Sequence, residues 1–311
     1  MSRIHEALKK AAQERNAQQE DILANGGPMD LTSGGLAGAV LTDDRTQPEG
    51  PSVVTDLQSA TFLRYQKFVK NCPRPAWKIR ADGSVFCADT LFPYGAERFR
   101  TLRSRLYQIA STQPIRRLLV TSSVAAEGKT FIAANLGQSF VRQPNRSVLL
   151  IDADLRAPRL HVPFGAPTIP GLTEYLRKEA DETQIIQVGQ EGNLCFVPGG
   201  GLVSNPSELL HSERMRQFID DMSRIFDWVI LDSPPVLAVH DASILADMCD
   251  GILFVVRAGA TDSTLAERAV TEFREKNLLG VVLNRVEKTD LYGGYYYGYA
   301  HGNVAENATS S

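Results

Sequence analysis

One short segment of this 311-residue chain constrains its fold more than any other. The apolar run 118–120 leads through a polar loop to Gly128, Lys129 and Thr130, and a helix-length segment follows at 129–142. A Gly-Lys-Thr sequence between a strand and a helix is the end of a P-loop, whose backbone N–H groups and helix N-terminus face phosphate oxygens. The segment therefore predicts a phosphate site at the carboxyl end of a buried strand.

The residue types in this loop fit the chemistry of a phosphate site. Lys129 places a positive charge near the β- and γ-phosphates of a nucleotide, and the Thr130 hydroxyl is a ligand for Mg²⁺. Two positions depart from the G-x-x-x-x-G-K-[ST] pattern, because Ser123 replaces the first glycine and Ala126 stands where glycine is common. An alanine restricts the backbone if this position requires a positive φ. The residues expected to line the nucleotide are Ser123, Val124, Ala125, Ala126, Glu127, Gly128, Lys129, Thr130 and Phe131.

Apolar runs of strand length alternate with helix-length segments in the second part of the chain. Continuous apolar strands that alternate with helices indicate a mostly parallel sheet with helices on both faces. We therefore predict an α/β P-loop NTPase domain over residues 91–290. The expected strands are 117–121, 148–151, 194–197, 228–231, 252–256 and 280–283, and the expected helices are 95–109, 129–142, 206–224, 241–248 and 262–276.

The residues before this domain fall into three parts. Residues 1–24 contain a helix with a thin apolar stripe, which is either a docking helix for a partner or a frayed, solvated helix. Residues 25–52 are rich in Gly, Pro, Ser, Thr and Asp and indicate a flexible linker. Residues 53–90 form a pre-core segment with a possible helix at 57–69, expected to lie against the core or to stay partly mobile. Residues 291–311 are expected to be a flexible tyrosine-rich tail.

Composition narrows the classes of function. The chain is 43% hydrophobic and 22% charged, as in ordinary soluble proteins, and its net charge of -3 gives no reason to expect a nucleic-acid partner. Apolar runs such as 251–256 are shorter than the roughly 20 residues of a membrane helix, and the N-terminus has no signal-peptide pattern. The cysteines form no metal or disulfide pattern and are expected to be free thiols in a reducing cytoplasm: Cys72, Cys87, Cys195 and Cys249.

Three aspartates follow two other apolar strands. The run 148–151 leads to Asp152 and Asp154, and the run 228–231 leads to Asp232. Ligands bind beyond the carboxyl ends of strands in an open parallel sheet, so these acids are expected beside the P-loop. Asp232 then reads as a Walker B carboxylate that holds Mg²⁺ directly or through water. The alternative is that strand-end aspartates form turns or cap helices.

The order and spacing of these motifs resemble Walker A, A′ and B of the bacterial tyrosine autokinases, or BY-kinases, of capsule and exopolysaccharide systems. That family is related to the partition-type and septum-site ATPases. The segment 97–103 fits the E-x-x-R-x-x-R helix of the family, 205–210 resembles a recurrent family segment, and 280–284 resembles the last core strand. The resemblance covers roughly residues 90–300, with a weaker match at the N-terminus.

The resemblance implies an ATP- and Mg²⁺-dependent tyrosine kinase. Lys129 would stabilise charge on the transferred phosphoryl group, while Thr130, Asp152 and Asp232 would hold the metal. Asp152 is the candidate to orient or deprotonate the incoming tyrosine hydroxyl, with Asp154 in support of the metal or base. These residues form the expected catalytic group.

Three further residues take expected roles from the same resemblance. Asn284 would contact adenine, as the matching asparagine does in related ATPases. Arg156 would contact phosphate or brace the acids, or form only a structural salt bridge. Asp241 is a weaker candidate for support of the site, and helix capping is the competing interpretation.

The resemblance also implies an assembly. A ring would be held by Glu97, Arg100 and Arg103, and each subunit would phosphorylate the tail of its neighbour. Accumulated phosphate charge would then open the ring. The expected partners are a membrane polysaccharide co-polymerase on a separate chain, as activator, and a cognate tyrosine phosphatase, with the kinase in the cytoplasm and recruited to the inner face of the membrane. The phospho-acceptors would be Tyr292, Tyr295, Tyr296, Tyr297 and Tyr299, which lie among glycines beyond the last expected strand.

Other interpretations of the motifs stay open at this point. The tyrosine cluster is alternatively an aromatic edge strand or a sticky low-complexity tail. A partition-type ATPase usually carries an extra lysine near the start of the P-loop, and Thr121, Ser122 and Ser123 stand there instead. The chain is alternatively a non-catalytic nucleotide-binding adaptor of a polysaccharide assembly complex.

Overall fold

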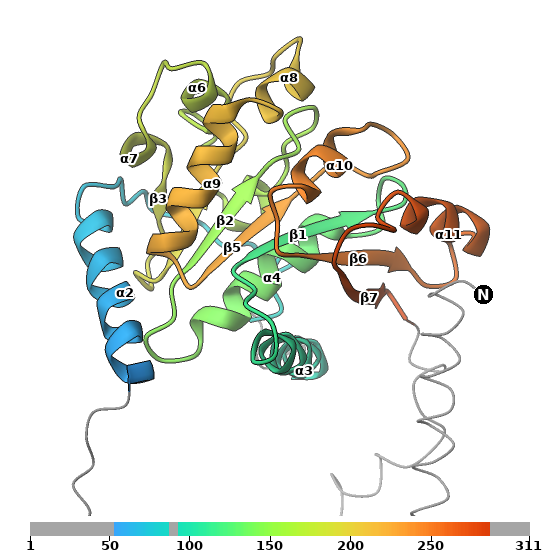
Figure 1. Ribbon diagram of the computed structural model, residues 1–311, viewed down its shortest axis with the longest axis horizontal. Coiled ribbons are helices and arrows are strands. Elements are labelled where there is room, and N and C mark those ends of the chain that lie inside the picture. Colours follow the sequence, from blue (N-terminus) through green and yellow to red (C-terminus); the bar gives the residue numbers. More distant parts are fainter. Residues whose placement is uncertain (1–52, 87–92, 287–311) are drawn as a thin grey trace, which may run out of the picture. The chain divides into compact units, whose positions relative to one another are not determined.

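The computed structural model describes residues 53–86 and 93–286 (Figure 1). The expected N-terminal helix, the linker and the tyrosine tail lie outside these residues. The boundaries proposed for the parts of the chain therefore remain predictions.

A seven-stranded sheet forms the centre of the fold, with strand order β3-β4-β2-β5-β1-β6-β7 (Figure 1). Every neighbouring pair is parallel except β3 and β4, which run antiparallel. The predicted parallel sheet is confirmed, but β3 was missed because a strand of two residues leaves no periodic pattern. The strands are β1 (Arg117–Ser122), β2 (Val148–Asp152), β3 (Gln187–Val188), β4 (Leu194–Val197), β5 (Trp228–Asp232), β6 (Gly251–Arg257) and β7 (Leu278–Asn284).

Helices cover both faces of the sheet, which explains why its central strands are apolar without alternation. Successive residues of one strand point to opposite faces, so Leu118 and Leu119 of β1 enter different core clusters. The helices α3 and α4 cover one face, and α9, α10 and α11 cover the other. The helices are α2 (Val53–Val69), α3 (Pro93–Ala110), α4 (Lys129–Val141), α5 (His161–Phe164), α6 (Leu172–Leu176), α7 (Glu182–Ile185), α8 (Pro206–Leu210), α9 (Glu213–Ile225), α10 (Asp241–Ala246) and α11 (Ser263–Thr271).

The single helix predicted over 206–224 is wrong, because the structure has two helices there. The helix α8 ends at Leu210, and Ser212 starts α9 as its N-cap. The Met215 N–H donates to the Ser212 hydroxyl over 3.3 Å. A serine side chain that satisfies a free N–H group favours a new helix start over continuation of the old helix.

The pre-core segment packs against the domain. The Tyr65 ring of α2 lies edge-on to Phe226, with centroids 5.4 Å apart. Trp77 packs on Phe164 at 5.2 Å and donates its indole N–H to Gln187 over 3.2 Å. Of the two expectations for this segment, the structure shows contact with the core.

Within the part of the chain that the structure describes, every helix is too short or too polar to span a membrane.

An aromatic stack holds α3 and α4 on the sheet. Phe140 of α4 is fully buried and stacks on Trp228 of β5 with centroids 4.4 Å apart. Tyr107 of α3 meets the Phe140 ring edge-on at 5.3 Å. Phe140 belongs to the helix that begins at the P-loop, so this packing holds that helix on the sheet.

We predict that Phe140→Ala lowers the free energy of unfolding by about 3–5 kcal/mol, as expected when a buried phenylalanine leaves a cavity. Urea unfolding followed by circular dichroism measures this change. The control is Leu202→Ala, since that side chain is 76% exposed and its loss should change stability by less than about 0.5 kcal/mol. Equal effects of the two substitutions would contradict this description of the core.

Candidate functional site

Three neighbouring strands carry the predicted site residues to one edge of the sheet. The strands β2, β5 and β1 are adjacent and parallel, so their carboxyl ends meet. Asp152 and Asp232 are direct register partners across β2 and β5. The P-loop follows β1 at this same edge. The structure therefore brings together the loop and the acids that lie far apart in the sequence.

The P-loop has a conformation that few residues adopt without strain. Gly128 has a φ of 98°, and a Cβ atom there would lie 2.0 Å from the Asn284 side chain. Ala126 has a φ of 65°. A left-handed conformation costs a non-glycine residue roughly 1–2 kcal/mol, so alanine at this position strains the loop.

The helix that follows the loop begins without a side-chain cap. Gly128 is the N-cap residue of α4, and no side chain accepts a hydrogen bond from the first turn. The first N–H groups of a helix have no partner within the helix, and they carry the positive end of its dipole. This uncapped start is the arrangement that binds a phosphate group.

Lys129 reaches across the site to the acids. Its Nζ atom lies 3.5 Å from Oδ2 of Asp154, and the two side chains are only 14% and 8% exposed. The ion pair holds the positive charge of Lys129 beside the P-loop, where little solvent reaches it. Both residues thus lie where the sequence placed them, and the ion pair holds the ammonium group in the site.

Asp152 and Asp232 are buried and lack a counter-charge in direct contact. Burial raises the pKa of the Asp232 carboxyl to about 6, against the opposing charge of Lys129. Burial and the neighbouring Asp232 raise the pKa of Asp152 well above its ordinary value, although the Leu160 N–H donates to its Oδ2 over 2.8 Å. Oδ1 of Asp152 and both carboxylate oxygens of Asp232 have no hydrogen-bond partner.

These three oxygens fit a Mg²⁺ ion. Such ions usually take one or two protein carboxylates and complete their shell with phosphate oxygens and water. No group of three or more His, Cys, Asp or Glu side chains within 53–86 and 93–286 could hold a metal by itself. The arrangement therefore suits a metal that arrives with a nucleotide, since two carboxylates leave the rest of its shell to phosphate oxygens and water.

Arg156 forms its ion pair with Asp241 and not with the three acids that it was expected to brace. Its Nε donates to Asp241 over 2.8 Å, and its terminal nitrogen donates to the Ser207 hydroxyl over 2.8 Å. Asp241 is fully buried and opens α10, where His240 is the N-cap residue. Of the interpretations left open for these two residues, the structure shows a salt bridge between them. Ser207 lies in the recurrent family segment, but no sequence pattern linked it to Arg156.

Other predicted residues lie around the loop in different roles. The Asn284 amide donates to the backbone oxygen of Glu127 over 2.8 Å. Phe131 packs against Phe99 of α3, with ring centroids 6.0 Å apart. Val124 and Ala125 are partly or fully accessible in the loop. Thr261 also contacts the loop, and the sequence offered no motif by which to find it.

The expected oligomer residues divide into two kinds. Glu97 and Arg100 are 64% and 49% exposed and form an ion pair of 2.9 Å along α3. Arg103 instead donates to the backbone oxygen of Ser139 over 2.5 Å. This contact joins α3 to α4 within one subunit, so Arg103 has a structural role that the sequence did not predict.

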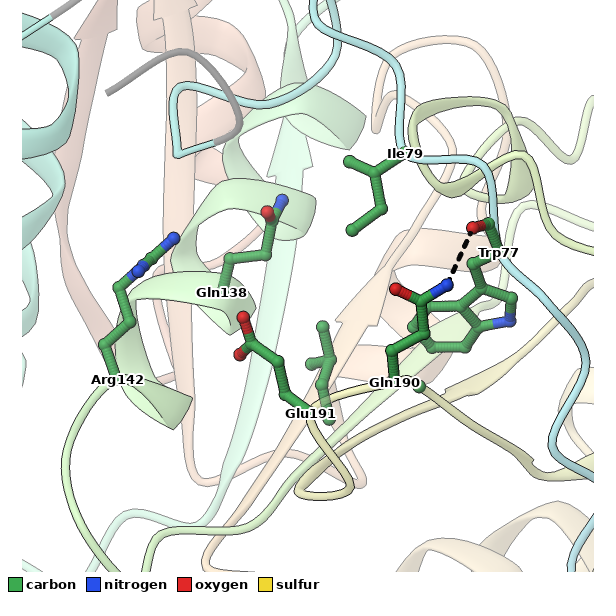
Figure 2. A pocket seen from close by; sticks show the side chains of 8 residues that line it. Trp77, Ile79, Gln138, Arg142, Gln190 and Glu191 are labelled. Atoms are coloured by element: carbon green, nitrogen blue, oxygen red, sulfur yellow. Dashed lines mark hydrogen bonds between the residues drawn. The ribbon is translucent and has the colours of Figure 1, made fainter. Parts of the chain in front are cut away.

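A small pocket lies at the end of the sheet where β4 starts, and Figure 2 shows side chains of its lining. Leu194, the first residue of β4, and Arg142, at the C-terminal end of α4, belong to its lining. Gln190 donates to the backbone oxygen of Trp77 over 3.3 Å beside it. The pocket holds about 70 Å³ and contains none of the predicted site residues.

Comparisons with known proteins agree with this geometry. A family model described as the CobQ/CobB/MinD/ParA nucleotide binding domain matches residues 118–301. The tyrosine-protein kinase YwqD of Bacillus subtilis (strain 168) is 36% identical over 207 residues, which is 65% of this chain and 86% of that protein. The tyrosine-protein kinase etk of Escherichia coli (strain K12) is 33% identical over 221 residues, which is 70% of this chain and 29% of that protein.

A solved structure extends the likeness to three dimensions. The kinase domain of the Escherichia coli tyrosine kinase ETK matches with a TM-score of 0.58 at 31% identity, and the match covers 66% of this chain and 80% of that chain. The family model spans more than half of the chain and includes the P-loop and all three acids. The chain therefore belongs to the CobQ/CobB/MinD/ParA nucleotide-binding family, and it is a bacterial tyrosine-protein kinase.

Proposed function

We propose that this kinase transfers the γ-phosphoryl group of ATP, bound with Mg²⁺, to the tyrosines of its own C-terminal segment. The observation that carries the proposal is the set of three partnerless carboxylate oxygens beside an uncapped helix start and a largely buried lysine. A bound phosphate group would suit the helix start and the lysine, and a metal ion would take the carboxylate oxygens. The five clustered tyrosines from Tyr292 to Tyr299 supply acceptors in the same chain.

Each residue of the site has a task in this transfer. The loop amides and Lys129 bind the phosphates and stabilise negative charge on the transferred group. Asp152 orients the tyrosine hydroxyl and accepts its proton, and Asp154 holds the lysine in place. Thr130, Asp152 and Asp232 would hold Mg²⁺, which when bound neutralises charge on the phosphate oxygens. Because a phenol has a pKa of about 10, close positioning matters more than a strong base.

The biological setting follows from the family resemblance. We infer a role in the control of exopolysaccharide or capsule polymerisation and export. The activator would be a membrane polysaccharide co-polymerase on a separate chain, which recruits the kinase to the inner face of the membrane. A cognate tyrosine phosphatase would reverse the reaction. The relative etk supports an association of such kinases with further polypeptide segments, because only 29% of that protein is similar to this chain.

The first test is autophosphorylation of the tag-free protein after full dephosphorylation. With ATP and Mg²⁺, mass spectrometry should find phosphotyrosine among Tyr292–Tyr299, and Lys129→Met should lower the rate by at least about 100-fold, since it removes a charge that stabilises the transition state. Lys70→Met is the matched control, because Lys70 is exposed at the end of α2. ATP turnover without phosphotyrosine would favour a partition-type ATPase, and nucleotide binding without turnover would favour an adaptor.

Asp232→Asn should raise stability and abolish activity at the same time. The folded protein holds the Asp232 proton up to about pH 6, whereas the unfolded chain releases it near pH 4. The native state therefore binds this proton more tightly, and metal-free stability falls as pH rises from about 4 to beyond 6. Thermal unfolding without metal should show the variant about 1–3 kcal/mol more stable than wild type at pH 7.5. The same pH profile for both proteins would refute this description of the carboxylate.

The α3 residues allow a test of the ring. Exposed ion pairs contribute little to folding, so Arg100→Glu should leave the melting temperature unchanged while it dissociates the oligomer. Arg103→Ala should lower stability by about 1–2 kcal/mol, because it removes the bond to Ser139. Analytical ultracentrifugation of dephosphorylated protein measures the assembly. Identical sedimentation of the phosphorylated and dephosphorylated forms would exclude phosphate as the signal that opens the ring.

A further inference from the structure

A glutamate in a phosphate-binding loop is an unexpected choice, and the structure shows where its charge goes. The Glu127 residue is only 2% exposed. Its carboxylate accepts hydrogen bonds from the Val124 N–H over 2.8 Å and from the Ser123 hydroxyl over 3.3 Å. The Thr261 hydroxyl donates to it over 2.6 Å. The carboxylate is thus turned inward, and no lysine, arginine or histidine of the described ranges pairs with it.

The three donors come from the start of the loop and from outside it. Ser123 and Val124 start the loop, whereas Glu127 precedes the glycine at its end, so the carboxylate closes the loop on itself. Thr261 lies in the turn between β6 and α11. The Thr261 N–H donates to Arg257 at the end of β6 over 3.1 Å, and the next residue, Asp262, is the N-cap of α11. The position of Thr261 is therefore fixed by two regular elements.

A second contact holds the same loop residue from the other side. The backbone oxygen of Glu127 accepts from the Asn284 amide at the end of β7 over 2.8 Å. Gly128 lies so close to that amide that no side chain would fit between them. The loop is thus attached to β6 and β7 through one residue, next to the two positions with positive φ, Ala126 and Gly128.

We propose that Glu127 and Thr261 are positioning residues, which hold the P-loop in its phosphate-binding conformation before the nucleotide arrives. The side chain of Glu127 acts through the loop backbone and does not touch the reacting atoms. A loop that is already ordered loses little conformational freedom when it binds, which increases affinity. The inference rests on the proposed ATP site and assigns the cause of its order to these two side chains.

The test compares substitutions that remove or retain one hydroxyl. Thr261→Val should raise the KM for ATP and the Kd for ADP by about 5- to 20-fold and leave kcat within about 2-fold, because ground-state binding is lost and the chemistry is not. Thr261→Ser should restore both constants, since it keeps the donor. Thr271→Val is the matched control, because the Thr271 hydroxyl bonds only within α11. Glu127→Gln should raise KM at least as much as Thr261→Val.

The controls separate this inference from the proposed function. Thermal unfolding of each variant without nucleotide shows whether it folds, and Thr261→Val changes only one partly buried hydroxyl. If wild type binds ADP and Thr261→Val binds it equally well, the positioning role is overturned while the ATP site stands. If Thr261→Ser binds as weakly as Thr261→Val, shape and not the hydroxyl is the cause, which also overturns it. If wild type binds no nucleotide, the proposed function itself fails.

Discussion

The constraint that the rest of the structure must satisfy is a pair of buried aspartates in register across two parallel strands. Asp152 and Asp232 end β2 and β5, where hydrophobic side chains from both faces of the sheet exclude water. Two buried carboxylates beside each other oppose folding, and the aliphatic strands behind them must outweigh this cost. A domain with one well-packed core on each face supplies that burial. Oxygens of these same carboxylates have no hydrogen-bond partner, so the groups that suit a cation are also the groups that destabilise the fold.

The order of the chain explains how such a site forms. Each crossover between parallel strands brings the chain back to the end of the sheet where the strands begin. The segments that follow β1, β2 and β5 therefore meet at the other end, although they lie far apart in the sequence. The P-loop residues, Lys129 and the acids then need no long-range pattern to find one another. Only the fold class had to be recognised for these residues to be placed at one edge.

Sequence patterns therefore predicted the strands and the polar loop well and predicted side-chain partners poorly. The buried strands have apolar runs that are bounded by polar residues, and these runs are specific for a sheet covered on both faces. The break between α8 and α9 depends on one serine cap, and β3 has only two residues. Thr261 contacts the P-loop and Ser207 contacts the Arg156–Asp241 pair, each through a single hydroxyl group. A hydroxyl near a motif leaves no periodicity, so geometry alone could identify these contacts.

The close contact between Asn284 and the P-loop also sets a limit of reach on the tail. The strand β7 ends at Asn284, beside the P-loop of the same chain. The first clustered tyrosine follows 8 residues later and the last follows 15 residues later. A fully extended chain covers at most about 28 Å over the shorter distance and about 52 Å over the longer one. Under the proposed function, these limits would rank the acceptors, because Tyr299 could meet an active site farther from Asn284 than Tyr292 could.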